Sequence, residues 1–125
     1  MHESTIKYNV ELITYILFIL ASDLTEYNKE QLVDFTEEIE GNVDVLFKPE
    51  FLAKISNGLE VPERTVSKMA ELRSLFIKLY ESGWHRKLID VGSILPIRSL
   101  ALSILTDLEI EYTEPLKYAN THLEW

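Results

Sequence analysis

The ten residues LITYILFILA, from Leu12 to Ala21, carry no charged side chain. A helix needs about 20 apolar residues to cross a bilayer, so this shorter run predicts a helix buried in a protein core. Ser4 is a suitable N-cap, and we expect the helix to extend from about Thr5 to Ala21. Because apolar side chains cover most of its circumference, we expect it to lie centrally among other helices.

The rest of the chain predicts helices that surround this central one. Asp23 or Thr25 can cap the next helix, and Gly41 with Asn42 would end it. Proline often stands in the first turn of a helix, which places further helix starts near Pro49, Pro62 and Pro96. The expected helices extend from about Thr25 to Glu40, Pro49 to Asn57, Glu63 to Ser82 and Pro96 to Leu108, with Leu116 to Trp125 as a short helix or a tail. The predicted fold class is mainly α, a compact bundle of about five to six helices.

Two segments leave a small amount of β structure open. Leu108 to Tyr112 alternates strictly between apolar and acidic residues, which is typical of a strand. Val43 to Phe47 also alternates and is the only evident partner for it. The alternative fold is therefore a helical bundle with a minimal two-stranded β ribbon.

Size and composition predict one domain, residues 1–125. Hydrophobic residues make up 46% of the 125, which is enough to form one core. The sequence contains no cysteine, which fits a reducing compartment. Met1 to Glu11 lacks the basic region of a signal peptide, so we expect a cytoplasmic protein without a membrane segment.

The residue patterns that carry catalysis are missing from the sequence. The four glycines stand singly, so there is no glycine-rich phosphate loop. His2, His85 and His122 are too far apart in sequence for a zinc-binding pattern. No serine stands in a nucleophile motif. We therefore predict a protein that is not an enzyme, with no catalytic residues, no cofactor and no metal.

Negative charge is concentrated in one part of the chain. The net charge is −9, and residues 26–62 hold nine Asp and Glu against three Lys. Neutralising phosphate groups requires a basic face, so direct nucleic-acid binding is disfavoured. An acidic region of this kind predicts a basic protein as the partner.

Five carboxylates of the expected second helix share one face. At about 100° per residue they fall within a third of the circumference, opposite Leu32, Phe35 and Ile39. Like charges four residues apart destabilise a helix, which indicates a cationic partner, although a solvated polar face is the simpler interpretation. Tyr27 is a candidate anchor beside them. The candidate partner-binding residues are Glu26, Tyr27, Glu30, Asp34, Glu37 and Glu38.

Small size, acidity, missing catalytic motifs and a helix with a carboxylate face together resemble bacterial toxin-immunity proteins, including those of contact-dependent growth inhibition and other polymorphic toxin systems. The resemblance implies a protein that binds a basic toxin nuclease and blocks its active site or substrate-binding surface. Two other classes stay open. One is a cytoplasmic regulatory or adaptor module that binds a basic protein or helix, and the other is a small homo-oligomeric structural protein.

Overall fold

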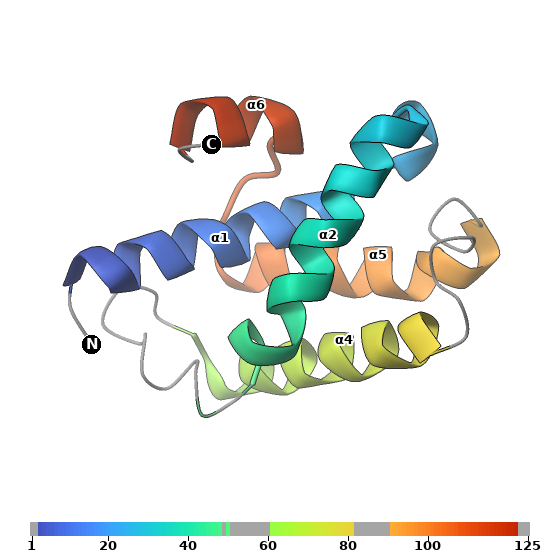
Figure 1. Ribbon diagram of the computed structural model, residues 1–125. Coiled ribbons are helices and arrows are strands. Elements are labelled where there is room, and N and C mark those ends of the chain that lie inside the picture. Colours follow the sequence, from blue (N-terminus) through green and yellow to red (C-terminus); the bar gives the residue numbers. More distant parts are fainter. Residues whose placement is uncertain (1–2, 49, 51–60, 82–90, 123–125) are drawn as a thin grey trace.

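The computed structural model describes residues 3–48, 50, 61–81 and 91–122. All regular structure in these residues is helical, which confirms the predicted mainly α bundle. Within them, no helix has both the length and the hydropathy needed to cross a membrane. The elements are α1 (Glu3–Ala21), the short 3-10 helix η1 (Leu24–Glu26), α2 (Lys29–Leu46), α4 (Glu63–Glu81), α5 (Val91–Asp107) and α6 (Pro115–His122) (Figure 1).

Helix α1 occupies the centre of the bundle, as its apolar sequence predicts. It packs against α2, α5 and α6, while α4 lies on the side away from α6 and packs against α5 and α2 (Figure 1). Every residue from Leu12 to Ser22 is buried. The Thr14 hydroxyl donates to the carbonyl of Val10 at 2.8 Å, and the Ser22 hydroxyl donates to that of Phe18 at 2.6 Å. These polar groups therefore find acceptors within their own helix.

Helix α2 begins later than the sequence predicts. Asn28 and Gln31 form a reciprocal capping box, in which the Gln31 amide donates to Asn28 Oδ1 at 2.8 Å and the Asn28 amide to Gln31 Oε1 at 3.0 Å. Asp23 instead caps η1, where its Oδ1 accepts from the Thr25 amide at 3.1 Å. The predicted continuous helix is therefore divided into the short 3-10 helix η1 and the separately capped helix α2.

Helix α2 also continues past Gly41, where we expected it to end. It extends to Leu46, and both Leu46 and Phe47 are buried in the core. The Asn42 side chain donates to the carbonyl of Glu38 at 2.8 Å, within the helix. Burial of the two apolar side chains outweighs the low helix propensity of glycine, which is only about 1 kcal/mol below that of alanine. The predicted first strand of the ribbon is wrong.

The second strand of the ribbon is wrong as well, because Leu108 to Tyr112 form a turn after α5 and a segment without regular structure. The amide of Ile110 donates to the carbonyl of Leu105 at 3.0 Å, and the amide of Glu109 to that of Thr106 at 3.1 Å. Glu109 has a φ of 57°. This is a Schellman motif with a left-handed residue after the helix, and Leu105 and Ile110 are its apolar pair. The alternation that resembled a strand therefore belongs to a helix end and the segment after it.

Helix α5 begins at Val91, earlier than predicted, and Pro96 lies inside it. The proline leaves one backbone carbonyl without its helical donor, yet Ile97 and Ala101 beyond it are buried. Within the described residues, α4 and α6 lie where the sequence predicts helices. The predicted helix from Pro49 to Asn57 lies outside the described residues.

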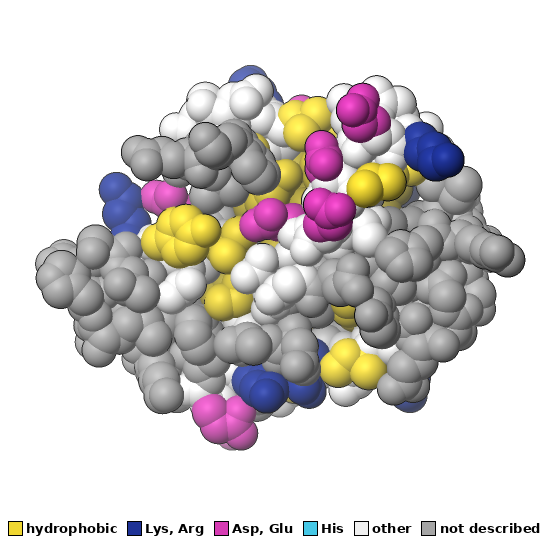
Figure 2. All heavy atoms as spheres, in the orientation of Figure 1, with side chains coloured by type: hydrophobic (Ala, Val, Ile, Leu, Met, Phe, Trp, Pro, Cys, Tyr) yellow, Lys and Arg dark blue, Asp and Glu magenta, His cyan; other side chains and the backbone are white. Residues whose placement is uncertain are grey.

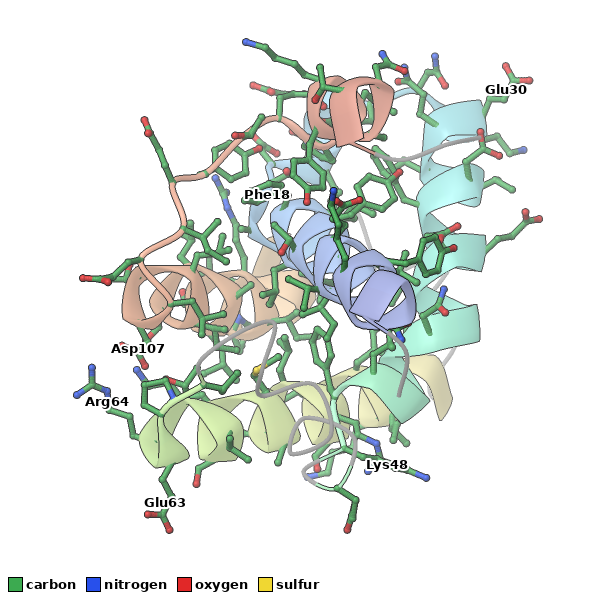
Figure 3. All side chains as sticks on the ribbon, turned by 90° about the vertical axis from the view of Figure 1, so that its left-hand side faces the viewer. Phe18, Glu30, Lys48, Glu63, Arg64 and Asp107 are labelled. Atoms are coloured by element: carbon green, nitrogen blue, oxygen red, sulfur yellow. The ribbon has the colours of Figure 1, made fainter. Side chains whose placement is uncertain are left out.

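Asp107, at the end of α5, joins this helix to α4. Its Oδ2 accepts from Lys68 Nζ at 2.7 Å and from the Thr65 hydroxyl at 3.1 Å, and Arg64 Nε lies 3.7 Å away (Figure 3). The hydrogen bond from Lys68 contributes most to a lowered pKa of the Asp107 carboxyl. The lowered pKa means that the carboxylate is ionised in the folded protein at neutral pH.

The course of α2 can be tested at Gly41. No atom lies within 4 Å of where its Cβ would stand, so Gly41→Ala should raise the free energy of unfolding by about 1 kcal/mol. Chemical denaturation measures this change. A loss of stability would show instead that Gly41 needs the left-handed conformation of a helix end.

The turn after α5 makes a separate prediction. A left-handed residue other than glycine costs about 1 kcal/mol, so Glu109→Gly should stabilise the protein by about that amount. Glu111→Gly removes an equal charge two residues away, where φ is negative, and serves as the matched control. An equal effect of the two substitutions would contradict the Schellman motif.

Candidate functional site

A cleft of about 390 Å³ lies between α2 and α6, above α1. Its floor is apolar and includes the side chains of Tyr15, Phe35 and Ala119, each of them almost completely buried. Polar and acidic side chains surround this floor, and Figure 2 shows carboxylates gathered beside hydrophobic side chains on this face. The complete lining is Tyr15, Gln31, Asp34, Phe35, Glu37, Glu38, Leu116, Ala119 and Asn120.

The structure brings four of the six predicted partner-binding residues together on α2. Glu30, Asp34 and Glu37 are exposed, Glu38 is half-buried, and Phe35 and Ile39 on the other side of the helix are buried. Glu30 projects away from the bundle at the start of the helix (Figure 3). We call these four carboxylates, Glu30, Asp34, Glu37 and Glu38, the α2 ridge.

The other two predicted residues lie outside the helix. Glu26 is the last residue of η1 and is exposed, so it does not share the helical face with the α2 ridge. Tyr27 follows it, and its ring packs edge-on against Phe35 with centroids 4.9 Å apart. The Tyr27 hydroxyl donates to Glu114 Oε2 at 2.5 Å. Tyr27 therefore already has contacts within the fold, and only part of its ring is left for a partner.

No cation compensates the α2 ridge in the described part of the chain. Both salt bridges found there involve Asp107, at the far end of α5. Lys29 is exposed and forms no ion pair with the ridge. Among these residues, the four carboxylates of the α2 ridge have no counter-ion.

Glu38 is the carboxylate of the α2 ridge whose ionised form is disfavoured by burial. Partial burial beside the cleft raises the pKa of the Glu38 carboxyl. Burial also raises the pKa of the Tyr15 hydroxyl below it, and the charges of Glu38 and Asp34 raise that pKa further. The negative potential of the rim carboxylates is therefore felt at the apolar floor, where the low dielectric strengthens electrostatic interactions.

Glu114 fixes the position of α6, the second wall of the cleft. Its carboxylate accepts from the backbone amides of Leu116 at 2.9 Å and Lys117 at 3.1 Å, in addition to Tyr27. Burial raises the pKa of Glu114, but these hydrogen bonds, led by that of Tyr27, outweigh it and leave the pKa lowered. The start of α6 is therefore held beside the start of α2.

Aromatic contacts attach α6 and the preceding segment to α1. Phe18 points from α1 toward α6 and meets the ring of Tyr118 edge-on, with centroids 5.0 Å apart (Figure 3). It meets Tyr112 in the same way at 5.8 Å, and the Tyr112 and Ser22 hydroxyls are 2.6 Å apart. The wall is thus built on the central helix.

Sequence reasoning did not find the residues that make the α2 ridge part of a cleft. Tyr15 looked like an ordinary core residue, and Leu116, Ala119 and Asn120 carry no motif. The spacing of Leu116, Ala119 and Asn120 on one helical face was the only available signal. In the described residues, no group of three or more Asp, Glu or His side chains is placed to hold a metal ion.

Comparison with known proteins finds no protein family, no characterised protein and no solved structure that matches this chain. The functional argument therefore depends on the geometry and electrostatics of the chain itself.

Glu38 provides a pH-dependent test of the cleft. A raised pKa means that the ionised form destabilises the fold above the folded pKa, and that this cost disappears as the pH falls toward about 4. Glu38→Gln should therefore stabilise the protein at pH 7, by less than about 1 kcal/mol because solvent still screens the group. The gain should vanish near pH 4.

Glu37→Gln is the matched control, since it removes an equal charge from an exposed neighbour. Denaturation curves of both variants and the parent at pH 4 and pH 7 measure the difference. Equal gains for the two variants at pH 7 would show that general charge reduction, and not burial of Glu38, is responsible.

Proposed function

We propose that this protein is a non-enzymatic acidic binding protein that neutralises a basic partner, and that it acts as an immunity protein for a toxin nuclease. The observation that carries the proposal is the position of the α2 ridge. Its carboxylates have no cationic partner in the described residues, and three of them line a cleft with an apolar floor. This arrangement offers both long-range attraction and a contact surface.

The α2 ridge would act as a substitute for the phosphates that a nuclease binds. Complementary charge steers association and can raise the rate of complex formation by 10-fold to about 1,000-fold at low ionic strength. Charge alone gives little residence time, which usually depends on a few well-packed anchors. The apolar floor of the cleft supplies a surface for such anchors.

The cost of the α2 ridge to the fold supports a role in binding. Glu30 and Asp34, and Asp34 and Glu38, are four residues apart on one helix, and like charges at this spacing are destabilising. Glu38 is in addition half-buried, and no cation of the described segments pairs with it. Departures from local stability of this kind are concentrated at functional sites.

The adaptor and homo-oligomer classes differ from this proposal in their partners. An adaptor would use the same α2 ridge for a different basic protein. Gene neighbourhood distinguishes the two classes, because an immunity gene is expected directly after a toxin gene. A homo-oligomer is favoured by one observation, since Leu95 and Leu102 are exposed one heptad apart on α5. A molecular mass that rises with concentration would identify it.

Charge reversal tests the proposed function. Affinity capture from the native organism at low salt, followed by mass spectrometry, should recover one basic nuclease-like protein. The combined variant Asp34→Lys, Glu37→Lys and Glu38→Lys should then lower the association rate with this partner at least about 10-fold at low salt and flatten its salt dependence.

The combined variant Glu63→Lys, Glu71→Lys and Glu111→Lys is the control. It changes the net charge equally at exposed positions away from the cleft. An equal effect of the two variants would reduce the role of the α2 ridge to net charge. An unchanged affinity and salt dependence in the ridge variant would refute the proposed function.

A further inference from the structure

The cleft between α2 and α6 combines two properties that a solvated acidic face does not need. Its floor is formed by Tyr15, Phe35 and Ala119, which are 2%, 1% and 1% exposed. Its rim carries three carboxylates, from Asp34, Glu37 and Glu38. An occupant must therefore be apolar along its length and cationic at its end.

We infer that the cleft receives an arginine side chain of the basic partner. This inference rests on the proposed function and adds the chemical group that the partner must supply. The methylene groups of an arginine can lie along apolar surface while its charged end stays among polar groups. Its guanidinium carries five donors in a planar fork, which suits several carboxylate acceptors at once.

The size of the cleft agrees with a single side chain. Sites for small-molecule ligands usually extend from about 300 to 1,000 Å³, so a cleft of about 390 Å³ is at the lower end of that range. It is open to solvent, with exposed Asp34, Glu37 and Asn120 on its rim. A side chain that projects from the surface of another protein can enter it without any change in the fold.

The carboxylate rim favours arginine over lysine. Guanidinium groups are more weakly hydrated than ammonium groups and offer a planar fork of donors to several acceptors at once. The two rings of the floor, Tyr15 and Phe35, are themselves packed edge to face with centroids 6.5 Å apart. The charges of Glu38 and Asp34 reach as far as the Tyr15 hydroxyl and raise its pKa, so a cation above this ring would meet a negative field.

The partner can be replaced by a short peptide for the first test. An isotope-labelled sample of the whole protein is titrated, into the millimolar range, with a capped peptide of four glycines around a central arginine. Amide shifts should change around Gln31, Phe35, Glu38 and Asn120, should saturate, and should disappear in high salt. A peptide with citrulline, which has the same shape without the charge, should give no such changes.

The lysine peptide and two charge variants refine the assignment. The lysine peptide should bind more weakly than the arginine peptide. Asp34→Asn, in the lining, should weaken arginine binding about fivefold, whereas Glu30→Gln, an equal charge loss on the same helix outside the lining, should change it less than about twofold. Equal shifts with all three peptides, or no localised shifts, would overturn the inference.

A variant that fills the cleft without changing charge separates this inference from the proposed function. Asn120→Phe places a ring at an exposed rim position. Ala119→Leu, on the same helix, places a larger side chain in the floor and so reduces the volume of the cleft. Either should weaken the captured partner at least about 10-fold through faster dissociation, with the association rate retained. Full affinity in both, together with sensitivity to ridge charge reversal, would overturn the arginine site and leave the proposed function standing. Arginine binding to the cleft without any basic partner in the capture would support the site and overturn the proposed function.

Discussion

The burial of α1 is the constraint on which the rest of the structure depends. From Leu12 to Ser22 every residue is buried, so the helix needs cover on every side. Helices α2, α5 and α6 supply that cover, and α4 completes the bundle by packing on α5 and α2. Apolar surface of this extent contributes far more to stability than any single hydrogen bond in the structure.

The cleft follows from this arrangement. Helices α2 and α6 both pack on α1 but leave a cleft between them, and its floor includes the almost completely buried Tyr15 of α1. The contacts of Glu114 with Tyr27 and with the first amides of α6 hold the start of α6 beside the start of α2. Phe35 and Ile39 point from α2 into the core, and this orientation places three carboxylates of the α2 ridge on the rim of the cleft.

Patterns within one helix could be predicted from the sequence, and features that depend on distant segments could not. The central helix, α4 and the exposed face of α2 follow from residue spacing alone. The helix end predicted at Gly41 and the helix start predicted at Pro96 were wrong because tertiary burial outweighs the helix propensity of single residues. The strand predicted from Leu108 to Tyr112 is wrong because the backbone there closes a Schellman motif after α5, which alternation along the chain does not reveal. The cleft could not be predicted from the sequence, because the lining residues of α6 lie more than 75 residues after those of α2.

The way in which buried hydroxyls are satisfied has a consequence for how this protein can evolve. Thr14 and Thr36 each donate to the carbonyl four residues earlier in their own helix. Neighbouring helices do not have to supply acceptors for these two hydroxyls, whereas the buried Thr65 of α4 donates to Asp107 of α5. The surroundings of Thr14 and Thr36 can therefore drift in sequence more freely than the contact between α4 and α5, while the outer face of α2 changes independently. Such a division would let the proposed binding face change on an unchanged framework.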